Sequence, residues 1–440
     1  IRLTIDLVEA NTLRQKSFIM TKPRNNLLTL QDSVGLKLAE MLEVNLQPNA
    51  LGIITAGGTS VPGAYEFYVQ GRGYLQRPEK TENIDNAIEL FMRAIKYDSL
   101  YALACDGLAH AFLRKYEDNH EIKWFDDAVR YSERALKLDS MHANIRVTLG
   151  QIHNVRGQYT KAIDEFRKAL ALNPNSADAY IRFGEAYALI ARHNDAENAF
   201  LKAIALKPDY WMGYNFLGDF YLQQGRYEEA VKQFIWVIKL TPDNIWGYNN
   251  AGAAYLYLEK FPEAKKMFER SIEIKPNEDA CSNLGSLYYS EKEYVMAART
   301  YEKALELNGT SHRIWGNLAE AYSRIPSERH KVHDTFQQAV LLALNQSKIN
   351  PDDPSVLANL AVYYVHLGEK TKARTYIDRA TERELDPYLM YLTAYTYEQL
   401  NNRELALNWI GKALKSGYPL AAIERDPELE QLRKDARFPR

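Results

Sequence analysis

Cysteine is almost absent from this sequence of 440 residues, which contains only Cys105 and Cys281. Two cysteines so far apart cannot supply the dense disulfide framework of a small secreted domain. They fit buried apolar positions in helices better. The sequence therefore gives no indication of an oxidising compartment.

An excess of charge of one sign and long apolar runs are also missing. The formal net charge is −2, which argues against a general nucleic-acid binder, because such proteins carry a basic domain or stripe. No apolar run approaches the roughly 20 residues that span a bilayer, so we expect no direct membrane insertion of this chain. Both the bacterial cytoplasm and the extracytoplasmic side of the inner membrane stay open as locations.

The first residues have neither an initiator methionine nor the charged-then-apolar layout of a signal peptide. This start indicates a processed chain or a piece of a longer protein.

Motifs for catalysis or cofactor binding are absent from the sequence as well. It has no glycine-rich phosphate loop, kinase catalytic loop, nucleophile elbow or cysteine-based metal pattern. The nearest approach to a metal site is His330, His333 and Asp334 at helical spacing, and a solvated helix face explains these residues better. We therefore expect no enzyme, no cofactor and no metal.

Hydrophobic residues, at 46% of the chain, recur instead with a fixed period. Small residues lie 34 positions apart in the middle of helical segments, and the last two intervals are 33 and 34: Gly150, Gly184, Gly218, Gly252, Gly285 and Ala319. A tyrosine follows three positions later in most units: Tyr187, Tyr221, Tyr255, Tyr288 and Tyr322. The next helical segment repeats an alanine with an aromatic residue four positions later, as in Ala230 and Phe234.

This pattern resembles the tetratricopeptide repeat family, which has the same period and residue types. The resemblance implies an all-α, right-handed solenoid of about ten helix-turn-helix repeats. We assign residues 61–420 to this superhelix and residues 421–440 to a C-terminal capping helix. Insertions break the register in three units: a short one in the first, a lengthened turn between the helices of the second, and a lengthened second helix with its exit loop in the eighth. Such insertions are secondary candidate contact sites.

Gly218 is unexpected in a helix, where glycine costs about 1 kcal/mol relative to alanine. The repeat explains it, because a small residue lets the first helix of a unit approach Ala230 of the second. Tyr221 and Phe234 then fill the space beside that contact. We predict that leucine at this position overpacks the pair.

The first sixty residues follow another pattern. Alternation over residues 1–7 predicts a strand, residues 13–20 a second strand of a hairpin, and residues 27–45 a helix. The strands "LTIDLVEANT…RQKSF" and the helix "LLTLQDSVGLKLAEML" resemble the end of a TolB-amino-terminal-like domain. This resemblance implies a partial α/β segment over residues 1–60, of the kind found before such repeats in bacterial kinases, adenylate cyclases and transcription regulators.

An asparagine precedes the small-residue motif in several units and predicts a row of amides on the concave surface. The row comprises Asn250, Asn283, Asn317 and Asn359. Because an amide both donates and accepts, each can pair with the backbone of an extended peptide, and the row resembles the one in O-GlcNAc transferases. Alternatively, asparagine at this position serves the neighbouring helices. Further groove candidates are Asn215, Asn249, Asp219 and Trp246.

These patterns favour a non-catalytic scaffold that binds a protein or peptide partner. The inner positions carry no lysine, so the lysine-and-asparagine set that clamps chaperone C-termini is not reproduced. The N-terminal resemblance indicates the partner-binding part of a larger bacterial signalling protein. The alternative is a self-assembling structural protein, in which solenoid ends and the edge of the N-terminal strand join copies into homo-oligomers.

Overall fold

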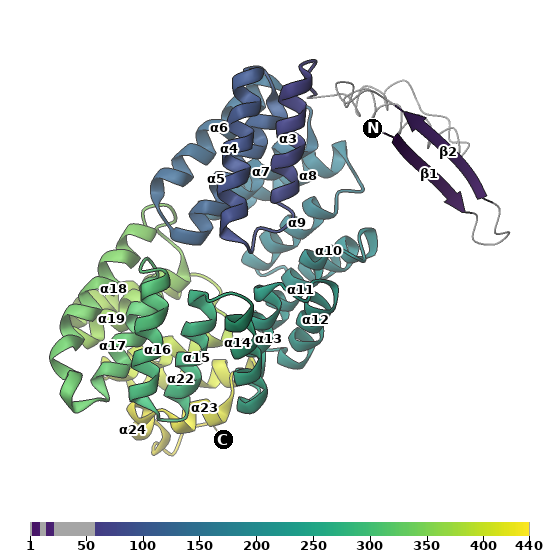
Figure 1. Cartoon of the computed structure of the whole chain (residues 1–440). Helices are drawn as coiled ribbons and strands as arrows, with labels where there is room; N and C mark the ends of the chain where they lie inside the picture. Colours follow the sequence, from purple (N-terminus) through teal and green to yellow (C-terminus); the bar gives the residue numbers. More distant parts are fainter. Residues whose placement is uncertain (1, 9–14, 22–57, 440) are drawn as a thin grey trace. The chain divides into compact units, whose positions relative to one another are not determined.

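The computed structural model describes residues 2–8, 15–21 and 58–439 (Figure 1). Strands β1 (Arg2–Val8) and β2 (Gln15–Thr21) form an antiparallel hairpin in which Leu3 pairs with Met20 and Ile5 with Phe18. The hairpin agrees with the alternation in the sequence. The helix expected over residues 27–45 lies outside the described residues.

The chain divides into two compact units, residues 1–152 with 167–174 and residues 153–166 with 175–440. Each unit contains successive antiparallel helix pairs (Figure 1), which confirms the predicted all-α solenoid of helix-turn-helix repeats. The helices of the first unit are α3 (Pro62–Tyr74), α4 (Thr81–Tyr97), α5 (Ala102–Asn119), α6 (Ile122–Leu138) and most of α7 (Ala143–Val155). It also includes the end of α8 (Tyr159–Leu172).

The second unit continues with regular pairs and ends in a less regular part. The regular helices are α9 (Ala177–Leu189), α10 (His193–Leu206), α11 (Trp211–Gln223), α12 (Tyr227–Leu240), α13 (Ile245–Tyr257), α14 (Phe261–Ile274), α15 (Glu278–Ser290) and α16 (Tyr294–Leu307). The others are α17 (His312–Ser323), η2 (Pro326–Lys331), α18 (Val332–Gln346), α19 (Pro354–His366), α20 (Lys370–Ala380), α21 (Pro387–Gln399) and α22 (Arg403–Lys415). The segment expected to form a capping helix contains α23 (Leu420–Arg425), η3 (Pro427–Leu429) and α24 (Glu430–Arg433).

Glycines inside the first helices are explained by aromatic rings of the second helices. A Cβ atom added to Gly218 would lie 2.5 Å from the ring of Phe234, and one added to Gly184 would lie 2.8 Å from Phe200. Phe234 is fully buried. The ring of the aromatic residue thus lies directly on the glycine, and Ala230, which was expected to face Gly218, is fully buried.

The turn within a pair also repeats, because it needs one residue in the left-handed region. Gly225 supplies it after α11 with φ +71°, whereas Glu259 and Lys292 adopt φ 57° and 64° after α13 and α15. Glycine is favoured there because it has no Cβ to clash with the backbone. The repeat keeps this backbone geometry even where the residue type is unfavourable.

The eighth unit departs from this plan. The insertion was expected to lengthen the second helix and its exit loop, but part of it forms the 3-10 helix η2 between α17 and α18 and so lengthens the turn before the second helix. A buried hydrogen bond of 3.0 Å joins His312 Nδ1 and the Tyr363 hydroxyl, and Phe336 of α18 stacks on His366 at 4.5 Å. Polar and ring contacts between units therefore supplement the glycine-aromatic contact here.

Candidate binding face of the second unit

The first helices of successive pairs form one continuous surface in the second unit, which we call the inner face. It comprises α9, α11, α13, α15, α17, α19 and α21, and α9 packs against α11, α11 against α13 and α13 against α15. In stacked helix pairs the first helices line the concave side. The inner face is therefore where the sequence-predicted groove residues are to be sought.

The asparagine row is only partly available for a ligand. Asn250 Nδ2 donates to Asn215 Oδ1 at 3.0 Å, and Asn215 Nδ2 lies 3.4 Å from a carboxylate oxygen of Asp219. Asn283 and Asn317 are half-buried, and neither makes a hydrogen bond to any residue in the described part of the chain. These two amides can still pair with a peptide backbone.

Two other predicted groove residues serve the fold. Asn249 is 2% exposed and donates to Asn277 Oδ1 at 2.9 Å, which in turn caps α15. Asn359 donates to the Ser355 carbonyl oxygen at 2.8 Å within α19. Trp246 is half-buried and packs edge-on against Trp211 at 5.7 Å.

Three carboxyl groups occupy the same repeat position on the inner face, directly after the small residue: those of Glu185, Asp219 and Glu320. Burial raises the pKa of Asp219 to about 7, and the charge of Glu185 adds to the effect. Burial and the nearby Asp426 raise the pKa of Glu320 to about 7, against the lowering effect of Arg324. Glu320 was not among the sequence candidates, although its register with Asp219 could have identified it.

Toward α17 and α21, the inner face carries several tyrosines and the arginine Arg313. Arg313 is exposed, and within the described residues no carboxylate lies within 4.0 Å of its guanidinium. Tyr257 and Tyr388 lie within electrostatic reach of it. Sequence reasoning assigned the tyrosines to packing and missed Arg313, because a single arginine at the second position of a helix carries no periodic signal.

The residues after α22 lie against this end of the inner face, and we call residues 416–429 the C-terminal strap. Tyr418 stacks on Tyr391 at 4.7 Å, and the Tyr391 hydroxyl donates to Asp426 at 2.7 Å. Arg324 of α17 forms an ion pair of 2.9 Å with Glu428. The strap thus places two carboxylates of the chain on an arginine of α17 and a tyrosine of α21.

Turns of early pairs also meet loops of late pairs along a line that we call the seam. A Cβ atom on Gly157 would lie 2.6 Å from Asn350 Oδ1, His193 Nε2 lies 3.1 Å from Glu384 Oε1, and Gly225 contacts Gly417. The partners are 193, 191 and 192 residues apart, from 350 − 157, 384 − 193 and 417 − 225. The second unit therefore closes on itself at a nearly constant offset of 191 to 193 residues.

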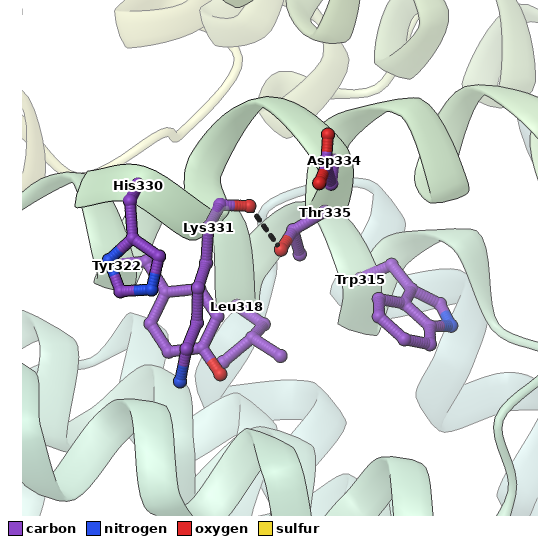
Figure 2. A pocket seen from close by; sticks show the side chains of 7 residues that line it. All are labelled: Trp315, Leu318, Tyr322, His330, Lys331, Asp334 and Thr335. Carbon is purple, nitrogen blue, oxygen red and sulfur yellow. Dashed lines mark hydrogen bonds between the residues drawn. The ribbon is translucent and has the colours of Figure 1, made fainter. Parts of the chain in front are cut away.

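A pocket of about 420 Å³ lies between α17 and the lengthened turn of the eighth unit (Figure 2). Its lining residues are Trp315, Leu318, Tyr322, His330, Lys331, Asp334 and Thr335. Lys331 is paired with Glu328 at 2.7 Å, Thr335 donates to the Lys331 carbonyl oxygen at 2.8 Å, and Trp315 donates to the Gly309 carbonyl oxygen at 2.9 Å. Most of its polar groups are thus already engaged.

The histidines of this turn do not converge with Asp334. His330 Nδ1 faces the Ser327 carbonyl oxygen at 3.1 Å, whereas His333 Nδ1 lies 3.4 Å from Asp334. Within residues 2–8, 15–21 and 58–439, no three His, Cys, Asp or Glu side chains are placed to hold a metal ion. The helices of these same ranges include none long and apolar enough to cross a membrane.

Family models match the repeats in this chain. One described as a TPR repeat matches residues 150–190 and 218–259. Two described as tetratricopeptide repeats match residues 280–311, and residues 177–210, 247–278 and 354–387. The repeats predicted from the sequence are therefore confirmed. The matches begin at residue 150, so they give no support to the TolB-like resemblance of the first residues.

Several solved structures are similar to parts of this chain. PilF of Pseudomonas aeruginosa is 25% identical, with 48% of this chain and 93% of that chain covered and a TM-score of 0.37. The thermophilic TPR protein TTC0263 of Thermus thermophilus is 22% identical, with coverage of 41% and 98% and a TM-score of 0.38. The anaphase-promoting-complex assembly Cut9–Hcn1 is 14% identical, with coverage of 93% and 84% and a TM-score of 0.44. No curated protein matches the sequence.

Proposed function

We propose, since this chain carries tetratricopeptide repeats, that its second unit is a non-catalytic scaffold that holds an extended peptide of a partner protein on the inner face. The observation that carries the proposal is the pair Asn283 and Asn317. They occupy the same position in adjacent units, are half-buried, and make no hydrogen bond to the described residues. Half-buried polar groups without partners favour a ligand that supplies them.

The charged residues of the inner face favour a polar ligand that binds in one orientation. Asp219 lies on α11 and Glu185, which pairs with Arg182 at 3.1 Å, lies on α9, whereas Arg313 lies on α17 without an ion-pair partner among the described residues. A peptide with a basic residue at one end and acidic residues at the other is complementary to this arrangement. The role as a partner-binding part of a larger bacterial signalling protein is compatible with such a scaffold, and it is the context we propose.

Peptide selection tests the proposal without knowledge of the partner. Peptides are selected from a random display library on the full chain, and their affinities are measured by fluorescence anisotropy. For the double variant Asn283→Ala/Asn317→Ala we expect about a tenfold loss, since 1.4 kcal/mol corresponds to tenfold and each lost hydrogen bond contributes about half of that or more.

The matched control is Asn198→Ala/Asn408→Ala, which removes two exposed amides from the second helices α10 and α22. It should leave the affinities unchanged. Selected peptides that bind both double variants equally well would show that the inner-face amides are not the binding site.

A further inference from the structure

Arg313 is the group on the inner face whose chemistry the fold does not explain. Arg313 is an exposed residue on the first turn of α17 and has no ion-pair partner among the described residues. Asp386 and Asp279 lie within its electrostatic reach. Asp386 already caps α21 by accepting from the Leu389 backbone N–H at 2.7 Å.

Besides these two carboxylates, the inner face near Arg313 carries side chains that can donate hydrogen bonds. Asn317 lies one helical turn further along α17 and Asn283 at the equivalent position of the adjacent unit, and both amides are free of bonds to the described residues. The hydroxyls of the half-buried Tyr257 and Tyr388 likewise make no hydrogen bond within the described part of the chain. A cation surrounded by free donors calls for an anionic, acceptor-rich ligand.

The C-terminal strap shows how the same two helices bind such a ligand. At the far end of α17, Arg324 pairs with Glu428 at 2.9 Å, and Tyr391 of α21 donates to Asp426 at 2.7 Å. Arg313 lies eleven residues before Arg324 on α17, and Tyr388 three residues before Tyr391 on α21. An arginine and a tyrosine of these two elements are thus present at both places, and near the strap they already bind two carboxylates of the chain.

We propose that Arg313, with Tyr388 and Asn317, is the subsite of the inner face that binds an acidic side chain of the partner peptide. This inference rests on the proposed function and names the chemistry of the ligand. An arginine fork can bind a carboxylate through two parallel N–H···O bonds, and a phenol can donate to the same group. The ligand is thus a peptide with closely spaced Asp or Glu residues, as in the Asp426-Pro427-Glu428 sequence of the strap.

The test uses the full chain and a capped, fluorescently labelled peptide with the sequence of residues 424–430, Glu-Arg-Asp-Pro-Glu-Leu-Glu. We expect saturable binding that weakens with added salt. We expect Arg313→Gln to weaken it about tenfold. An amide probe, in which Asn and Gln replace Asp and Glu and which therefore lacks carboxylates, should bind the wild-type chain about tenfold more weakly. Lysine at position 313 should restore part of the affinity, since it keeps the charge but loses the fork.

Arg299→Gln is the matched control, because Arg299 is an exposed arginine on the second helix α16. Equal binding to the Arg313→Gln and Arg299→Gln variants, with unchanged thermal melts, would overturn the proposal. So would equal binding of the amide probe, or no binding of the acidic probe to the wild-type chain at millimolar concentration. If display-selected peptides still depend on Asn283 and Asn317 in that case, the scaffold function stands and only the acidic specificity fails.

Discussion

The regular pairs α9–α16 and the later elements α17–α24 are stabilised by different kinds of contact. In the regular pairs an aromatic ring lies on a glycine of the same unit, as Phe234 does on Gly218. In the later part the distinctive contacts join distant residues, as in the 2.9 Å ion pair between Arg324 and Glu428. The repeated residues thus determine how the two helices of one repeat pack. Residues that depart from the repeat pattern determine how the second compact unit ends and closes on itself.

Leucine at position 218 should give the largest change, because a Cβ atom there would already lie 2.5 Å from the Phe234 ring. We expect Gly218→Leu to lower the free energy of unfolding by about 1–3 kcal/mol through overpacking. Thermal or urea unfolding followed by circular dichroism measures the change. Adding Phe234→Leu should recover part of the loss, and a melt identical to wild type would contradict the packing described for the regular pairs.

The acidic cluster near the strap should make stability depend on pH. The pKa of Glu320 is about 7 in the folded chain and 4.5 ordinarily. Because the folded chain favours the protonated carboxyl group of Glu320, the contribution of this group to stability is complete below pH 4.5 and is lost as the pH rises through 7. Glu320→Gln should therefore gain stability over wild type between pH 5 and 8, by on the order of 1–2 kcal/mol.

The measurement is the difference in melting temperature between wild type and Glu320→Gln at each pH. The difference is needed because burial lowers the pKa of His366 to about 4, which destabilises the fold below pH 6.5 in both proteins. A difference that stays constant from pH 5 to 8 would show that Glu320 does not titrate in this range.

Substitution of Gly411 in α22 should have the opposite effect on stability to substitution of Gly218. A Cβ atom there would meet only Pro439, at 3.8 Å. We expect Gly411→Ala to raise the free energy of unfolding by roughly 0.5–1 kcal/mol, because alanine is the better helix former. Destabilisation in a urea titration would mean that the last pair is packed as tightly as the regular ones.

The smallest effect is expected at the seam. Glu384 and His193 are 57% and 35% exposed in their side chains, and exposed ion pairs contribute about 0–1 kcal/mol. Glu384→Gln should lower the midpoint of urea unfolding only slightly, and the decrease should be smaller at high salt. A loss as large as that of Gly218→Leu would show that this pair, rather than packing, holds the seam.

The sequence predicted the repeats because periodicity reports local packing: Gly184, Gly218 and Gly252 recur at the same place in each unit. The asparagine row was predicted by the same register, but periodicity cannot distinguish Asn359, bound to its own helix, from Asn317. Arg313, Glu320 and the strap depend on contacts between units, which have no period in the sequence. Whether the groove residues bind a peptide stays a prediction.

The nearly constant offset across the seam has a consequence for how this chain can change length. Adding or deleting one 34-residue unit between Gly225 and Asn350 would move every later loop one unit away from the turn that it now meets. An open solenoid tolerates such changes, since each unit needs only its neighbours. In this chain the seam contacts can form only with the present number of repeats between the two partners. Natural or designed relatives with a different number of repeats must therefore change the residues on both sides of the seam together.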